Sequence, residues 1–246
     1  MTQIKGWMAG AAAAALALVI GISVAIFSFS SSGIELYDGW EDAPAADVRM
    51  GEQEVRLAMA LDYALQQGGD EARIALEKFA NFRASRAALL AQAAEQENDA
   101  RKLQAALKYG ASASALQPDN PSHWVNLGRI YQMAGRFDPM EATEAPVMFT
   151  RALALDETYK PALLALGQWH FEKMQYDRSL PYLERLIEQD ASYLSQNWFV
   201  SLLTNTYILA GKADIGANRL ATLETSHLPG SQKAIAILAR ESNTKY

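Results

Sequence analysis

The sequence predicts an all-α protein in which an N-terminal transmembrane helix precedes an α-solenoid of stacked antiparallel helix pairs. Residues 6–34 contain no charged side chain, and residues 8–29 are almost wholly Ala, Leu, Val, Ile and Gly. Between residues 121 and 189, large and small residues recur at offsets that place them on one face of a helix. Glycine and proline signals separate these helical segments.

Residues 8–29 are long enough to cross the hydrocarbon core of a bilayer, which takes about 20 apolar residues. Lys5 precedes the segment and acidic residues follow it, so the positive-inside rule places the N-terminus in the cytoplasm. The alternative is a cleaved signal peptide, with Ser28-Phe29-Ser30 as a poor cleavage site, but its apolar run usually spans about 7–15 residues. We therefore favour an uncleaved single-pass anchor, residues 1–34, in the inner membrane, with the following domain in the periplasm of a Gram-negative host.

Residues 35–50 are predicted to form an acidic tether. The stretch 35–54 carries seven acidic residues against the single base Arg49, and Pro44 lies inside it. Like charges keep such a segment solvated and hold it away from anionic lipid headgroups. A docking function is the alternative to this spacer.

Residues 51–120 have a helical pattern throughout, which predicts a degenerate N-terminal repeat region. A first helix through Leu65 should end at Gly68-Gly69, and Asp70 is a candidate cap for a second helix that extends to Leu89. The polar break at residues 95–99 precedes a third helix, and the run 118–121 (PDNP) is typical of a turn between repeats.

Residues 121–228 carry the clearest helix pairs. In the first, a Leu-Gly pair lies on one helical face with two aromatic residues, and Gly135 is predicted to end that helix in the left-handed conformation. The positions assigned to the interior of the pairs are Trp124, Leu127, Gly128, Tyr131, Ala145, Phe149 and Ala152; then Leu163, Leu166, Gly167, His170, Tyr176, Leu183 and Leu186; then Trp198, Leu203, Tyr207, Gly211, Gly216, Leu220 and Leu223.

Residues 229–246 are predicted to form a capping helix and a tail. Pro229-Gly230 should break the chain, and Ser231 is a candidate cap for a last helix over 232–240. Its apolar face, with Ala234 and Leu238, should cover the exposed end of the stack, because terminal repeats need a cap.

This pattern resembles the tetratricopeptide repeat (TPR), whose signature is a tryptophan, a Leu-Gly pair, a tyrosine, and then Ala, Phe, Ala. The spacing of the units exceeds the family's period of about 34 residues. Insertions at residues 138–144 and 190–196 account for the excess. The resemblance implies antiparallel helix pairs that bury their apolar faces only by stacking.

Composition and spacing argue against catalysis. The chain has no cysteine, which excludes thiolate metal sites and cysteine nucleophiles. Its three histidines, His123, His170 and His227, are far apart in the sequence, and no phosphate-binding glycine loop or Gly-x-Ser-x-Gly elbow occurs. The net charge of −6 argues against nucleic acid as a partner. We expect no enzyme activity, no cofactor and no metal.

The first helix of each pair is predicted to line a groove that binds a peptide or a partner subunit. An arginine flanked by side-chain amides can bind a peptide carboxylate or backbone, and Arg129, Gln168 and Asn205 occupy equivalent positions. The alternative is an ordinary solvated helix face. The predicted groove residues are Asn126, Arg129, Gln132, Met133, Gln168, Phe171, Asn205 and Ile208, with Val125, Leu164 and Ser201 beside them.

Residues 120–137 and 144–189 also resemble the apocytochrome-binding TPR subunits of c-type cytochrome maturation systems. That resemblance implies a periplasmic chaperone-like scaffold that holds the C-terminal segment of an apocytochrome c while other subunits attach heme. The alternative is an accessory scaffold of another envelope complex, such as a secretion, pilus, translocon or respiratory complex. The sequence leaves the partner, the binding face and the oligomeric state open.

Overall fold

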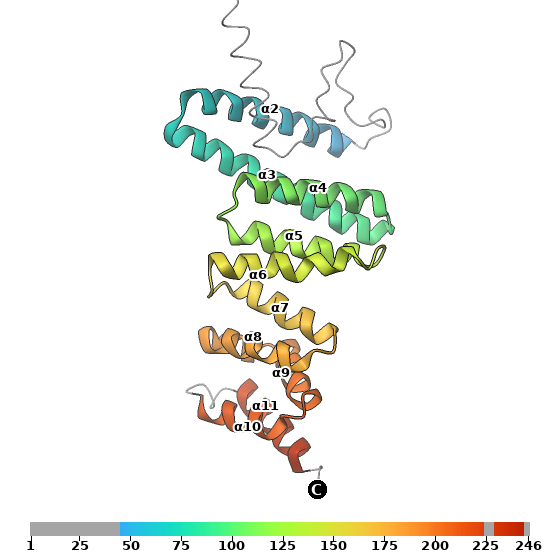
Figure 1. The fold of residues 1–246 in the computed structure, drawn as a ribbon, viewed down its shortest axis with the longest axis vertical. Helices are drawn as coiled ribbons and strands as arrows, with labels where there is room; N and C mark the ends of the chain where they lie inside the picture. Colours follow the sequence, from blue (N-terminus) through green and yellow to red (C-terminus); the bar gives the residue numbers. More distant parts are fainter. Residues whose placement is uncertain (1–44, 224–228, 244–246) are drawn as a thin grey trace, which may run out of the picture. The chain divides into compact units, whose positions relative to one another are not determined.

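The computed structural model describes residues 45–223 and 229–243, and every regular element within these residues is a helix (Figure 1). This confirms the all-α prediction for that part of the chain. The chain divides into two compact units, residues 1–143 (unit 1) and 144–246 (unit 2). The predicted anchor, residues 8–29, lies outside the described residues. Among the helices that are described, none is both long enough and apolar enough to span a bilayer.

Unit 1 consists of successive helices joined by short turns. Gly68 and Gly69 have positive φ angles of 77° and 65°, which suit glycine and reverse the chain after the first helix, as predicted. This first helix begins within the acidic tether, so residues 45–50 of that predicted spacer are helical. The helices are α2 (Ala45–Gln67), α3 (Gly69–Glu97), α4 (Ala100–Leu116) and α5 (Pro121–Ala134).

The α3–α4 contact is made largely by small residues, which lets the two backbones approach closely. The alanines at positions 80, 87, 91 and 94 of α3 are buried, and so are Ala106, Gly110 and Ala113 of α4. A Cβ added to Gly110 would lie 3.9 Å from the Cβ of Ala87. α5 then packs against both α3 and α4.

A nearly buried ion cluster links α2, α3 and α4. Glu54 of α2 pairs with Arg83 at 2.8 Å and with Arg86 at 3.1 Å, and all three side chains are less than one-fifth exposed. The hydroxyl of Tyr109 on α4 donates to the same carboxylate at 3.0 Å. Both guanidinium groups lie within 5.0 Å of the Tyr109 ring centre, a cation–π distance. Burial and the adjacent carboxylate raise the pKa of Tyr109 to about 12.

Unit 2 continues the pattern with shorter helices around one apolar core. The core is centred on Leu163, Leu183, Phe199, Leu203 and Tyr207, all of which are fully buried. The elements are α6 (Ala145–Leu155), α7 (Lys160–Glu172), α8 (Tyr176–Gln189), the 3₁₀ helix η4 (Ala191–Ser195), α9 (Asn197–Leu209), α10 (Ala213–Thr222) and α11 (Pro229–Asn243).

In unit 2, a glycine on one helix lies against a large residue on the next. A Cβ at Gly167 of α7 would meet the Leu183 side chain of α8 at 2.5 Å. A Cβ at Gly216 of α10 would lie 2.6–2.8 Å from ring atoms of Tyr207 on α9. These are the small positions that the sequence pattern assigned to close helix approach, and each is filled by a large partner.

Two predicted helix ends differ from the structure. Gly135 does end α5, but its φ of −59° is right-handed. A Cβ there would overlap the Cβ of Ala142, so close approach and not a left-handed turn explains the glycine. Asp70 does not cap α3, because that helix already begins at Gly69, and its carboxylate instead pairs with Arg73 at 3.5 Å.

Three assignments in the C-terminal part of the chain are also wrong. α11 begins at Pro229, so Ser231 is a buried residue inside the helix and not its cap. A Cβ at Gly230 would overlap the carbonyl oxygen of Leu194, so this glycine permits contact and does not break the chain. Trp198 is 46% exposed, and the adjacent Phe199 is the buried aromatic residue. α11 packs on α9 and α10 with Ala234 and Leu238 buried, as expected of a cap.

Replacing Gly216 by Ala should lower the free energy of unfolding of unit 2 by up to about 2 kcal/mol. The added Cβ collides with the rigid, buried ring of Tyr207, which costs about 1–3 kcal/mol, and the better helix propensity of alanine returns about 1 kcal/mol. The control is Gly110→Ala, whose Cβ meets the flexible ends of Leu127 and Ile130 at 3.2–3.3 Å and the Cβ of Ala87 at an ordinary contact distance of 3.9 Å. Urea unfolding of both variants tests this; equal stability of the two would contradict it.

Replacing Glu54 by Gln should destabilise unit 1 by about 3 kcal/mol, because removing one partner of a buried pair leaves charges without compensation. Glu52 on the same helix provides a matched control. Its pair with Arg56 is 3.3 Å long but more than half exposed on both sides. Glu52→Gln should therefore cost about 0.5 kcal/mol or less. Thermal unfolding followed by circular dichroism would separate the two variants. Similar losses of stability would show that the cluster stabilises unit 1 no more than an exposed ion pair does.

Candidate functional site

The predicted groove residues are divided equally between the two units. Asn126, Arg129, Gln132 and Met133 lie on α5 in unit 1, where Arg129 is exposed and the other three are half-buried. Val125, also placed in the groove by the sequence, is only 2% exposed and cannot meet a ligand.

The other four predicted residues lie in unit 2. Gln168 and Phe171 are half-buried on α7, and the Phe171 ring packs at 5.5 Å on the Tyr176 ring. Asn205 is exposed on α9, whereas Ile208 packs against the core. The predicted residues thus lie on three helices, α5, α7 and α9, and the groove itself stays a prediction.

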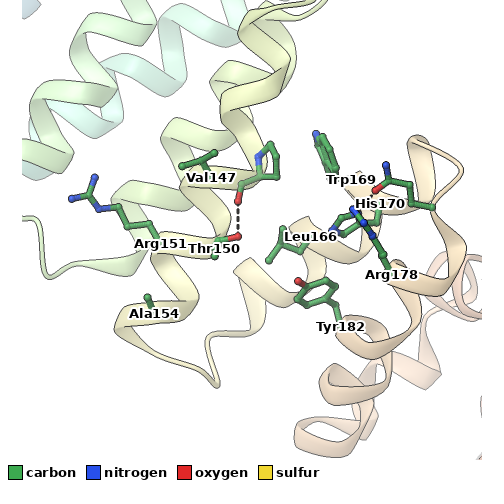
Figure 2. A pocket seen from close by; sticks show the side chains of 11 residues that line it. Val147, Thr150, Arg151, Ala154, Leu166, Trp169, His170, Arg178 and Tyr182 are labelled. Carbon is green, nitrogen blue, oxygen red and sulfur yellow. Dashed lines mark hydrogen bonds between the residues drawn. The ribbon is translucent and has the colours of Figure 1, made fainter.

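Unit 2 contains an open hollow of about 710 Å³ that the sequence analysis did not predict (Figure 2). It is lined by α6, by the C-terminal half of α7 and by α8 with the turn that precedes it. The lining residues are Pro146, Val147, Thr150, Arg151 and Ala154 of α6, Leu166, Trp169 and His170 of α7, and Gln175, Arg178 and Tyr182 of the following turn and α8.

The α7–α8 turn sets the position of the lining residues. Met174 has a left-handed φ of 57°, and the backbone N–H of Gln175 donates to the carbonyl of His170 at 2.8 Å. The Ser179 hydroxyl donates to the carbonyl of Gly167 at 2.7 Å, and Leu183 occupies the space beside that glycine. The turn thus fixes Gln175 and Arg178 close to the end of α7.

The base of the hollow is apolar and aromatic. Leu166 is 1% exposed, and the buried His170 ring is stacked with the Tyr182 ring at 5.7 Å. The Trp169 ring meets the His170 ring edge-on at 5.1 Å. The Nδ1 of His170 lies 2.8 Å from the Oε1 of Gln175, which fixes the ring orientation. These contacts make a preformed surface for an apolar side chain.

The charged residues that line the hollow are all basic. Its lining includes Arg151 and Arg178 and no aspartate or glutamate. Figure 2 shows Arg178 directed toward His170, whereas the head group of Arg151 points away from Trp169. The Lys173 ammonium lies 5.9 Å from the Trp169 ring centre. The nearby Asp177 carboxylate pairs with Lys212 at 2.7 Å, so it does not neutralise Arg178.

One polar atom of the hollow residues lacks a partner. The indole Nε1 of Trp169 is buried and has no hydrogen-bond acceptor within the part of the chain that the structure describes. A buried donor without an acceptor costs about 1–3 kcal/mol. The aromatic base and the exposed Arg178 together suit an apolar group and an anion.

The described histidines have structural environments. His123 belongs to unit 1, is 2% exposed, and has its Nε2 3.0 Å from the Oε1 of Gln117. Burial lowers the pKa of His123 below its usual 6.5. His170 is held by Gln175 in unit 2, and His227 lies outside the described residues. Over residues 45–223 and 229–243, no three His, Asp or Glu side chains are grouped so that they could hold a metal ion.

Comparison with known proteins identifies no relative: no protein-family model matches the chain, and no curated protein matches it in sequence. The chemistry of the site is therefore read from the site itself.

Below pH 6.5, His123 should make the fold progressively less stable. Its pKa is lower in the folded than in the unfolded chain, so the unfolded chain binds the proton first, and stability present above pH 6.5 is lost as the pH falls toward the folded pKa. His123→Asn should reduce this loss when urea midpoints at about pH 7.5 and about pH 5.5 are compared. An identical pH-dependent loss in the variant would assign the effect to other groups.

Proposed function

We propose that this chain is a TPR-type adaptor, anchored in the inner membrane through residues 8–29, whose periplasmic helix pairs hold a segment of another protein. The observation that carries the proposal is the packing of unit 2, in which Gly167 meets Leu183 and Gly216 meets Tyr207 across successive helices. A solenoid of helix pairs offers extended, partly exposed helix faces that suit an elongated polypeptide.

The composition of the exposed faces supports binding over catalysis. Gln168 and Asn205 present side-chain amides from α7 and α9, and Arg129 presents an exposed guanidinium from α5. Amides and arginine recognise peptide backbone and carboxylates without further machinery. A non-enzymatic scaffold is the function that these groups support best.

The partner we propose is an apocytochrome c or a heme-attachment subunit, because residues 120–137 and 144–189 resemble apocytochrome-binding TPR subunits. The alternative partner is a subunit of a secretion, pilus, translocon or respiratory complex, since any of these could use the same helix faces. Under both alternatives the protein is anchored in the membrane, its repeats are exported, and it acts by binding and not by catalysis.

Photo-crosslinking of the full-length protein in its native membrane tests the proposal. A benzophenone amino acid at Gln168 or at Asn205 should yield a covalent adduct, and one at the exposed Glu157 in the α6–α7 turn should not. Mass spectrometry identifies the adduct as a c-type apocytochrome or heme-attachment subunit, or as a subunit of another envelope complex. No adduct at positions 168 and 205 above that at position 157 would refute the adaptor.

Arg129→Ala should weaken binding of the crosslinked partner segment by about 1–3 kcal/mol, the range for a hydrogen bond to a charged group. The control is Arg56→Ala, which removes an exposed arginine from α2. Affinities measured at low salt, where a surface charge contributes most, give the comparison. Unchanged affinity for Arg129→Ala would discard a binding role for that residue.

A further inference from the structure

We infer that the hollow between α6, α7 and α8 is a docking site for a peptide segment that places a large apolar side chain next to acidic side chains. This inference rests on the proposed adaptor function and names the chemistry of the segment. It also places binding on a surface that includes α6 and α8, which carry none of the predicted groove residues.

The apolar half of the inference follows from the walls of the hollow. Leu166 and the stacked rings of His170 and Tyr182 form a base that is already assembled, because Gln175 holds His170 in place. Val147 on α6 lines the same hollow and is 53% exposed, so a large part of this apolar side chain faces water. A bulky apolar side chain would cover this valine and fill part of the 710 Å³ volume.

The acidic half follows from charge complementarity. The whole chain carries a net charge of −6, yet no carboxylate lines the hollow and Arg178 stands at its rim. Arg178 forms no ion pair within the described residues. The carboxylate next to it in the sequence, Asp177, pairs with Lys212 instead. A guanidinium held beside an apolar wall binds a carboxylate more strongly than one in open water, because the local dielectric constant is lower.

The positions of the cations favour acidic side chains over a single C-terminal carboxylate. Arg178 stands on α8, and Lys173 follows α7 above the Trp169 ring. Because these two cations lie on different elements close to the aromatic residues, each can meet an acid that flanks one apolar residue. A terminal carboxylate would engage only one of them.

The test uses full-length protein in nanodiscs and a labelled peptide, capped at both ends, with a phenylalanine between two glutamates. Fluorescence anisotropy should show binding that weakens as salt rises. Replacing both glutamates by glutamine, or the phenylalanine by serine, should reduce the affinity by roughly tenfold or more, which corresponds to about 1.4 kcal/mol. Equal affinity of the Glu and Gln peptides would overturn the inference.

Substitutions on the protein provide the second arm. Arg178→Gln and Val147→Glu should each lower the affinity for the Glu peptide by roughly tenfold. The matched control is Ile215→Glu, which places the same acid at a residue of equal exposure, 53%, on α10 away from the hollow. Circular dichroism melting should be unchanged in all three variants, since the altered side chains are exposed. Unchanged peptide affinity in Arg178→Gln and Val147→Glu would overturn the inference.

Two further outcomes separate this inference from its alternatives. A Gln peptide with a free C-terminal carboxylate that binds as tightly as the Glu peptide would assign the site to chain termini and overturn the choice of acidic side chains. If the crosslinks at Gln168 and Asn205 persist while no peptide binds the hollow, the adaptor stands and only the docking site fails. If neither the crosslinks at Gln168 and Asn205 nor peptide binding to the hollow is observed, the proposed adaptor function fails as well.

Discussion

The close approach of neighbouring helices depends on glycines whose missing side chain is replaced by a large residue from the next helix. Leu183 fills the space at Gly167, and Tyr207 fills the space at Gly216. Because a packed core cannot absorb even one extra carbon without shifting, these contacts set the separation of α7 from α8 and of α9 from α10. The separation of α7 and α8 in turn sets the width of the hollow, so the candidate site depends on the same constraint.

A second, polar device appears in both units. A tyrosine hydroxyl donates to a glutamate that also pairs with arginine, and the three side chains come from three successive α-helices. The groups are Glu54, Arg86 and Tyr109 on α2, α3 and α4, and Glu184, Tyr207 and Arg219 on α8, α9 and α10. Burial raises the pKa of both tyrosines, so the phenols remain neutral donors. Apolar packing tolerates sliding of helices, whereas such directional contacts fix their register.

The sequence predicted helix positions well, because periodicity of 3.6 residues survives in a single chain and glycine and proline limit the ends. It placed Phe149 and Leu166 in the interior correctly. It chose Trp198 over Phe199 because both are aromatic and adjacent, and only tertiary packing decides which one faces the core. It misread Gly135, since a glycine selected for close approach to Ala142 looks the same in sequence as one selected for a left-handed turn.

The candidate site was less predictable than the fold. The hollow requires Val147, Leu166 and Tyr182 from three helices to face one another, and no local pattern encodes the distance between helices. No sequence pattern singles out Arg178, because the ion pair of its neighbour Asp177 with Lys212 joins α8 to the turn before α10, far away in the sequence. The anchor and the periplasmic location rest on residues outside the described ranges and remain sequence predictions.

The alanine-lined contact between α3 and α4 has a consequence for how this chain can diverge. Side chains larger than alanine have little room there, because the contact is made by buried alanines, and a Cβ at Gly110 would already lie 3.9 Å from the Cβ of Ala87. Val55, Met59 and Tyr63 on α2 are about half or more exposed and can change freely in size. In distant descendants of this sequence, the exposed positions of α2 should therefore vary in size, whereas the contact positions of α3 and α4 should remain alanine, glycine or serine.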